Sequence, residues 1–400
     1  MSDTPSIVRP ARVDSVPSEA MAELVEASNT FAFEFWRRFG RAGENLAVSP
    51  ASIHLALSMV LAGAGGKTAE EIARAMRLAN PEAVHEAAAA LLRDWNDPDR
   101  SDYELRVISR LFGEQGFRFK ADYLQFAVQY YGAPLEELDF RSRPEPSRAR
   151  INAWIAEATA NRIQNPIPPG ALDDLTRLVL VNVVYFLGDW AEPFETIHTR
   201  RSRFFLQDGG FAPVPMMTQT TDVLYHRGRD LKFIELPYVG HELAMTILLP
   251  DTVDGLPALE ERLSAGKLDD WIAKLQHTEV EIDLPRFTID PPDSIDLIPV
   301  LNELGMNLAF RMFEADLTGI AAAPDPEDRL YINAARHKCF VKVDESGTEA
   351  VGATIFEVVG ASGPLSQPER FRADHPFLFV IRDVRSGMIF FVGRVTEPHS

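Results

Sequence analysis

The sequence predicts an α+β fold built as one large domain. Helical patterns dominate residues 18–163, and strand patterns dominate the rest of the chain. Segregation of the two patterns, rather than strict alternation, is typical of α+β proteins. No internal repeat, low-complexity tract or linker divides the chain, and 46% of its residues are hydrophobic, which is enough for a sizeable core.

The elements of the first half are predicted from helical periodicity. A helix is predicted from Ser18, with Leu24, Ser28, Phe31, Phe35 and Phe39 on one face and basic residues near the end. A short strand then turns through Ser49-Pro50 into an apolar helix from Ser52, and Thr68 with Glu71 three residues later predicts a capping box for the next helix. The remaining elements of this half are a strand within 103–113 and helices over 82–95, around 123–131 and over 146–163.

The second half consists mainly of predicted strands. The continuous apolar run over 177–190 is typical of a strand buried on both faces. Alternating patterns predict strands within 200–250 and 278–290, and residues 375–395 read as a buried hairpin. Two helices are expected at about 256–276 and 293–305.

Composition excludes several classes of partner. With 40 Lys+Arg against 59 Asp+Glu the net charge is −19, which disfavours nucleic acid and anionic membranes. The single cysteine, Cys339, excludes an intramolecular disulfide and fits a reducing compartment. The N-terminus has no apolar signal-peptide core, and no stretch predicts a transmembrane helix. We therefore expect a cytoplasmic monomer with a flexible tail at 1–17, although secretion by another route stays open.

A search for catalytic patterns finds one weak candidate. His337 and Cys339 are two residues apart, so on a strand they would share a face and could form a thiol–imidazole pair. The alternation of "HKCFVKV" favours the simpler interpretation that both are core residues. No nucleophile elbow, P-loop, HExxH or CxxC occurs, and the nine histidines show no metal-ligand spacing. The sequence predicts no enzyme, no cofactor and no metal.

The stretch from Glu345 to Phe371 has an unusual composition. It alternates like a half-buried strand, but many positions are Ala or Gly, which weaken a strand, and it ends in a segment rich in Gly, Pro, Ser and Gln. An ordinary edge strand would explain the alternation but neither the small residues nor the polar end.

Five blocks of sequence carry a resemblance to a known family. They are "NLAVSPASIHLALSMVLAGAGGKTAEEI", "LVLVNVVYFLGDWAEPF", "LPRF", "HKCFVKVDESGTEAVGAT" and "HPFLFVIRD" with "IFFVGRV", and they extend from Asn45 to Val395. In content, order and spacing the chain resembles the serpins, a family of serine protease inhibitors. The resemblance implies a single domain over 18–400, with three β-sheets, eight or nine helices and an exposed reactive-centre loop at about 345–371.

The resemblance also implies a suicide-type inhibitor. After a protease cleaves the loop, the loop inserts into the central sheet as a new strand. Small side chains suit a segment that is solvated first and central later, and we expect Thr348 to lie near the exposed loop before cleavage. The hinge implied by the family comprises Glu345, Gly347, Thr348, Glu349, Ala350, Val351, Gly352, Ala353 and Thr354.

Counting along the loop gives the bond that the protease would cleave. With Glu345 as the first residue, the seventeenth is Ala361, so the family pattern implies Ala361-Ser362. A small residue there suits an elastase-like or subtilisin-like protease. Counting back from Pro376 instead suggests Leu365-Ser366, which would favour a chymotrypsin-like target.

Two further groups of residues transfer from the family. A buried polar cluster under the opening sheet, the shutter cluster, would comprise Ser49, Ser52, Asn182 and His337. A second group where the loop first enters, the breach cluster, would comprise Trp190, Arg286 and Glu345. The helix at 82–95 has one basic residue, Arg93, so heparin activation is not expected. A non-inhibitory member acting as a carrier, chaperone or storage protein is the alternative, and the small hinge residues favour inhibition.

Overall fold

The structure is a computed structural model that describes residues 10, 18–39, 43–97, 99–291, 293–322, 329–348 and 367–399. The predicted tail at 1–17, apart from Pro10, and most of the predicted reactive-centre loop therefore lie outside the described residues. None of the helices in the described ranges is long and apolar enough to cross a membrane.

The described part of the chain contains nine α-helices and three sheets, which confirms the α+β fold class. The helices gather mainly in the first half of the chain, as the periodicity predicts. They are α1 (Ser18–Phe39), α2 (Pro50–Ala62), α3 (Gly66–Ala75), α4 (Val84–Trp95), α5 (Ala121–Tyr131), α6 (Pro144–Ala158), α7 (Leu256–Arg262), α8 (Ala265–Ile272) and α9 (Ile298–Glu303), with short 3-10 turns η1 (Thr196–His198) and η2 (Leu308–Phe310).

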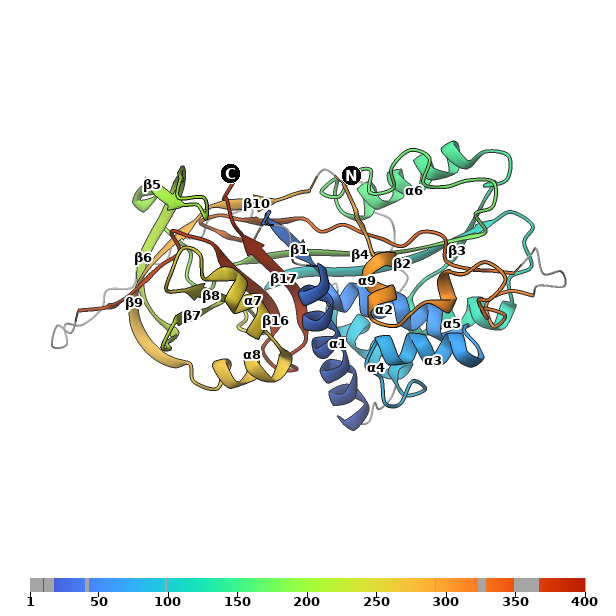
Figure 1. The fold of residues 1–400 in the computed structure, drawn as a ribbon, viewed down its shortest axis with the longest axis horizontal. Helices are drawn as coiled ribbons and strands as arrows, with labels where there is room; N and C mark the ends of the chain where they lie inside the picture. Colours follow the sequence, from blue (N-terminus) through green and yellow to red (C-terminus); the bar gives the residue numbers. More distant parts are fainter. Residues whose placement is uncertain are drawn as a thin grey trace.

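A six-stranded sheet runs along the long axis of the molecule (Figure 1). Its two long strands, β2 and β4, pair antiparallel over eleven residue pairs, from Tyr103 with Gly188 to Gly113 with Leu178. The strand order is β10 (Phe287–Ile289), β13 (Val341–Val343), β14 (Gly347–Thr348), β4 (Leu178–Asp189), β2 (Tyr103–Glu114) and β3 (Leu135–Leu138).

A nine-stranded sheet forms the other end of the molecule, and a two-stranded sheet pairs β11 (Ile295–Asp296) with β12 (Arg336–His337). The nine-stranded sheet contains the predicted C-terminal hairpin, whose two strands are fully buried. Its order is β1 (Leu46–Val48), β17 (Ile389–Val395), β16 (Phe377–Asp383), β8 (Leu243–Pro250), β7 (Leu231–Pro237), β6 (Phe211–Arg227), β9 (Gln276–Pro285) and β15 (Glu369–Arg372), and β5 (Arg200–Phe205) pairs with β6.

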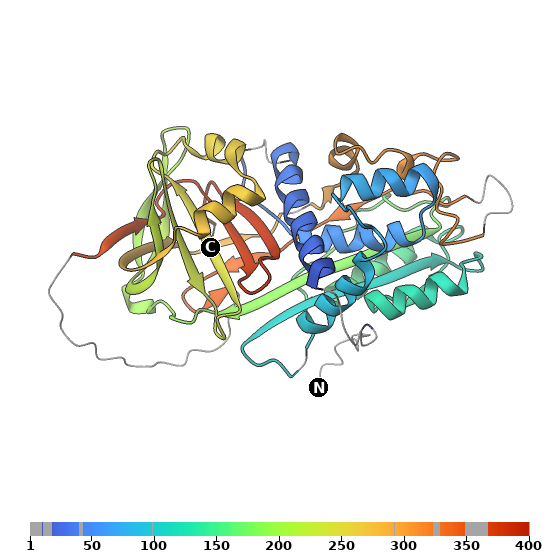
Figure 2. The ribbon, with the colours of Figure 1, turned by 90° about the horizontal axis from the view of Figure 1, so that it is seen from below.

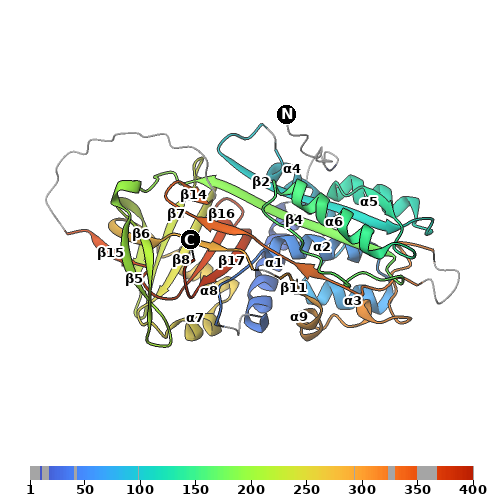
Figure 3. The ribbon, with the colours of Figure 1, turned by 90° about the horizontal axis from the view of Figure 1, so that it is seen from above.

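Helices cover both faces of the six-stranded sheet. Figure 3 shows α6 lying across β2 and β4 on one side, and Figure 2, seen from below, shows the blue helices of the N-terminal part on the other. Beneath α6 a compact apolar cluster joins helix and sheet, with Trp154 packed edge-on against Phe112. This arrangement leaves the six-stranded sheet as the central layer of its half of the molecule.

The structure corrects three details of the predicted elements. The capping box at Thr68 is wrong: Gly65 is the N-cap of α3, and the Thr68 hydroxyl accepts a hydrogen bond from the Asp316 backbone instead. Glu71 likewise accepts from two distant backbone amides. The helix expected at 256–276 is two helices, because Ser264 caps a new helix by accepting from Lys267 N. The helix at 146–163 ends earlier, at Ala158.

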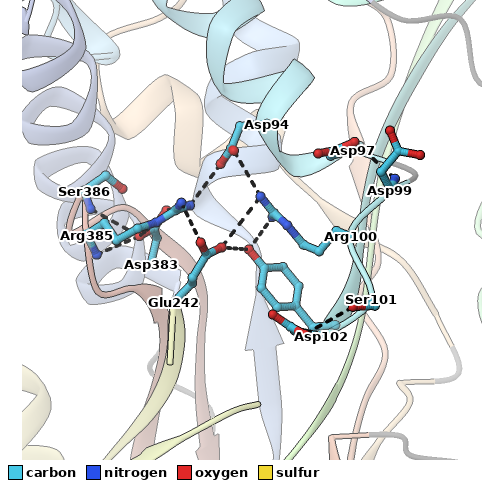
Figure 4. A network of polar contacts seen from close by, with 11 residues as sticks. Asp94, Asp97, Asp99, Arg100, Ser101, Asp102, Glu242, Asp383, Arg385 and Ser386 are labelled. Atoms are coloured by element: carbon cyan, nitrogen blue, oxygen red, sulfur yellow. Dashed lines mark hydrogen bonds and ion pairs between the residues drawn. The ribbon is translucent and has the colours of Figure 1, made fainter. Parts of the chain in front are cut away.

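An ion-pair network fastens the start of β2 to the nine-stranded sheet (Figure 4). Arg385, in the turn between β16 and β17, contacts Asp94 at 3.0 Å, Glu242 at 2.9 Å and Asp383 at 3.2 Å. Arg100 pairs with Asp94 on the same side, also at 3.0 Å. The network joins α4, β2 and two turns of the other sheet, so the end of β2 next to the candidate site is held in place.

Candidate functional site

The predicted hinge begins as a strand between two other strands. In β14, Thr348 pairs with Val343 of β13 on one side and with Gly188 of β4 on the other. Gly347 is required here by close packing, since a Cβ at this position would lie 2.0 Å from the carbonyl oxygen of Gly188. The described part of the hinge therefore already lies in the six-stranded sheet, between β13 and the C-terminal end of β4.

This position corrects the expectation for Thr348. The family resemblance implies a residue near the exposed loop, but Thr348 is 3% exposed. Its hydroxyl lies 2.6 Å from the hydroxyl of Tyr238, which is itself completely buried. A charged substitution at Thr348 would thus disturb the intact protein as well as any later insertion.

Glu345 is the best-anchored residue of the breach cluster. Its carboxylate accepts hydrogen bonds from Arg286, with Nε at 2.8 Å, and from the hydroxyl of Thr199. Its side chain is 6% exposed, whereas that of Arg286 is 37% exposed. Burial raises the pKa of the Glu345 carboxyl, but the hydrogen bonds from Arg286 and Thr199 outweigh it and hold the pKa below its ordinary value. The carboxylate is therefore charged and fixed where the hinge begins.

Trp190 holds the backbone of the two residues that flank Glu345. Its backbone N–H donates to Ser346 O at 2.8 Å, and its indole Nε1 donates to Asp344 O at 3.1 Å. The indole stacks on Tyr238 with 4.7 Å between the ring centroids. The structure thus brings together all three predicted breach residues, and it adds Tyr238 and Thr199, which the sequence reasoning missed.

The shutter cluster forms two connected groups beneath the sheet. In the first, the backbone N–H of Ser49 donates to Nε2 of His337 at 3.0 Å. In the second, Ser52 donates to Asn182 Oδ1, and Asn182 Nδ2 donates to Ser109 Oγ at 2.8 Å. The first turn of α2 connects the groups, since Ser49 caps this helix and its hydroxyl accepts from Ser52 N. Ser109, which pairs with Asn182 across β2 and β4, was not predicted.

The thiol–imidazole alternative is not supported by the surroundings of His337. Cys339 Sγ does lie 3.0 Å from His337 Nε2, but both side chains are buried. Burial lowers the pKa of His337 to about 4 and raises the pKa of the Cys339 thiol. A buried neutral thiol is a poor nucleophile. The described residues also include no group of three or more His, Cys, Asp or Glu arranged to hold a metal ion.

The candidate reactive bonds belong to the part of the chain between β14 and β15. Ala361, Ser362, Leu365 and Ser366 lie outside the described residues, as do the hinge residues from Glu349 to Thr354. The described chain stops at Thr348 of β14 and resumes at Gln367, shortly before β15, which pairs in parallel with β9 of the nine-stranded sheet. The segment in question thus connects one sheet to the other.

Comparison with known proteins identifies the family. A protein-family model described as Serpin (serine protease inhibitor) matches residues 26–398. The chain belongs to the serpin family. The family is one of inhibitors rather than enzymes, in agreement with the expectation that this serpin is not an enzyme.

Named relatives extend over nearly the whole length of this serpin. It is 37% identical to the leukocyte elastase inhibitor of Equus caballus and 39% identical to Serpin B9 of Homo sapiens, in each case over 94% of this chain and 100% of the relative. Among solved structures, a loop-inserted, cleaved ovalbumin mutant is 28% identical, with a TM-score of 0.83 over 94% of this chain and 100% of that one. The serpin fold is confirmed by these matches.

Proposed function

We propose that this serpin is a suicide-type inhibitor of serine proteases that traps the acyl-enzyme by inserting its cleaved loop into the six-stranded sheet. The observation that carries the proposal is the position of β14, where Gly347 and Thr348 pair with β4 and β13. A strand that starts between two others can lengthen in the same direction. The solved relative that is cleaved and loop-inserted supports this reading.

The edge of β4 below β14 supports the proposed path of insertion. Among the described residues β4 pairs only with β2 and, at Gly188 and Asp189, with β14, so most of one edge has no strand partner. A cavity of about 80 Å³ lies along this edge, between residues 178–183 of β4 and side chains from 333–338. Ile155 of α6 also lines it. An unpaired strand edge is a template for an added strand.

The proposed trap works through distance. The protease serine would form an ester with the carbonyl of Ala361, the bond to Ser362 would break, and the amine of Ser362 would leave. Insertion of about seventeen extended residues at ~3.3 Å each would move the attached protease by about 56 Å. Distortion of the protease would disable its triad and oxyanion hole, so that water could not hydrolyse the ester. The inhibitor supplies no catalytic group.

The target follows from the residue at the cleaved bond. Ala361 would suit an elastase-like or subtilisin-like protease, and the name of the horse relative, leukocyte elastase inhibitor, supports an elastase-like one. Cleavage at Leu365 would favour a chymotrypsin-like target instead. A monomeric state, a cytoplasmic location, independence from heparin, and the division into a tail at 1–17 and one domain at 18–400 all stay predictions.

A gel experiment tests the proposed function. The protein is incubated with pancreatic elastase, subtilisin and chymotrypsin, and each mixture is boiled in SDS. An inhibitor of this kind gives an adduct that survives SDS with at least one of the three proteases. Complete cleavage within the loop by all three, with no adduct, would make the protein a substrate and support the non-inhibitory alternative.

A further inference from the structure

A cavity of about 210 Å³ lies where the turn between β6 and β7 meets α7 and α8, and none of its lining residues belongs to the hinge, the breach cluster or the shutter cluster. Its lining is strongly basic, although the chain as a whole has a net charge of −19. Four cationic side chains line it against a single carboxylate, that of Asp230. The cations are Arg229, Arg262, Lys267 and Lys274.

The acids of the protein only partly neutralise these cations. Arg262 pairs with Asp230 at 2.7 Å, and Lys267 lies 3.9 Å from Asp270. Arg229 and Lys274 have no acidic partner within the described ranges of the chain. Like charges that converge on one cavity repel one another, and this cost is relieved when an anion binds between them.

The floor of the cavity offers a further hydrogen-bond donor. Trp271 lines the cavity although the residue is only 8% exposed, and its ring packs against Phe233 with 6.3 Å between centroids. The indole N–H donates no hydrogen bond among the described residues and is not one of their buried unpaired polar atoms, so it is free to donate to a ligand in the cavity. A bound anion would accept from it and from the guanidinium and ammonium groups.

We propose that this basic cavity binds a small multivalent oxyanion, of the kind that carries two or three linked phosphate groups. Arginine forks and lysine ammonium groups are the side chains that recognise phosphate oxygens in proteins. The volume of about 210 Å³ is below the roughly 300–1,000 Å³ of a pocket for a drug-sized ligand, which suits a short anion.

The surroundings favour a short anion over a long polyanion. Asp269 and Asp270 are exposed on α8 beside the basic residues, and Asp251 follows β8 next to the turn, where its backbone N–H bonds to Asp230 O. These carboxylates limit the positive region to the cavity itself. A sulfated glycan chain would have to pass over them, at an electrostatic cost.

Calorimetric titration of the intact protein with tripolyphosphate tests the proposal. The test variant is the double substitution Arg229→Glu/Lys274→Glu, and the matched control is Arg201→Glu/Arg203→Glu, which reverses two exposed charges on β5 that pair with no described acid. We expect binding with one site, weakened at least tenfold in the test variant and less than twofold in the control. Equal weakening by both would reduce the effect to net charge and overturn the proposal.

Two further readouts keep the result interpretable. First, binding should change the tryptophan fluorescence, and Trp271→Phe should remove that change. Second, the neutral variant Lys274→Gln should weaken binding while its melting temperature stays equal to that of the wild type. Absence of binding at millimolar tripolyphosphate, or binding of a long heparin chain but not of tripolyphosphate, would overturn the proposal. The outcome is independent of the proposed protease inhibition, which the gel experiment tests separately.

Discussion

The contact between Thr348 and Tyr238 makes a quantitative prediction about the intact protein. The phenol of Tyr238 is fully buried, and within the described chain its only hydrogen-bond partner is the Thr348 hydroxyl at 2.6 Å. Thr348→Val keeps the shape of the side chain but leaves the phenol unsatisfied, so it should lower the free energy of unfolding by about 1–3 kcal/mol. Tyr238→Phe leaves the threonine hydroxyl without its partner in the same way.

Removal of both hydroxyl groups should cost less than the two single losses together. We expect a coupling free energy of about 1–2 kcal/mol, because the double variant leaves no orphaned group. Urea unfolding of the wild type, the two single variants and the double variant measures it, with Thr220→Val at an exposed position of β6 as a control that changes stability by less than about 0.5 kcal/mol. Single losses that add within about 0.5 kcal/mol would refute a docked hinge in the uncleaved protein.

Three further predictions concern the reactive bond, the shutter cluster and the breach cluster. Ala361→Arg should redirect inhibition toward trypsin-like proteases, measured as inhibition rates; unchanged specificity would move the reactive bond to another residue. Burial lowers the pKa of His337 to about 4, so the folded protein binds fewer protons than the unfolded chain between pH 4 and about 6.5, and stability falls as the pH drops through this window. His337→Gln, whose amide oxygen can accept from Ser49 N, should reduce the fall in the free energy of unfolding between pH 7 and pH 5 by about 2 kcal/mol. Urea unfolding at the two pH values measures this, and an equal fall in the wild type and the variant would contradict the assignment. Arg286→Met should weaken the anchoring of Glu345 by about 1–2 kcal/mol, discounted for the exposure of the arginine, and shorten the half-life of inhibitory activity at 37 °C; a half-life equal to that of the wild type would show that the pair does not hold the hinge.

Much of the fold could be predicted because the local patterns agree with the final structure. The hairpin at 375–395 forms two buried strands, as its continuous apolar sequence indicates. The run at 177–190 forms the predicted strand β4, but residues 177–180 are only half-buried, so burial on both faces is not reached along its whole length. The errors arose where a residue serves a distant partner. Thr68 and Glu71 have the spacing of a capping box, but their side chains accept hydrogen bonds from backbone more than 230 residues away. The break before α8 did carry a local signal, the N-cap Ser264.

The candidate site was predicted less completely, for the same physical reason. The breach and shutter residues were identified through the family resemblance, and the structure brings them together. Tyr238 and Ser109 could not be found, because their roles depend on which strands become neighbours. The burial of Thr348 was also missed, since the resemblance implies an exposed loop from about residue 345, and alternation predicts the face of a strand but not whether the strand is already paired.

The change in thermal stability on cleavage of the loop tests the account most directly. The intact protein and the protein cleaved within residues 349–366 are heated side by side, and unfolding is followed by circular dichroism. If the loop inserts along the unpaired edge of β4, the new strand adds ladder hydrogen bonds and buries apolar area, so the cleaved form should melt at a much higher temperature. Mass spectrometry confirms that the loop is cut in the cleaved sample. Equal melting temperatures of the intact and cleaved proteins would then contradict insertion.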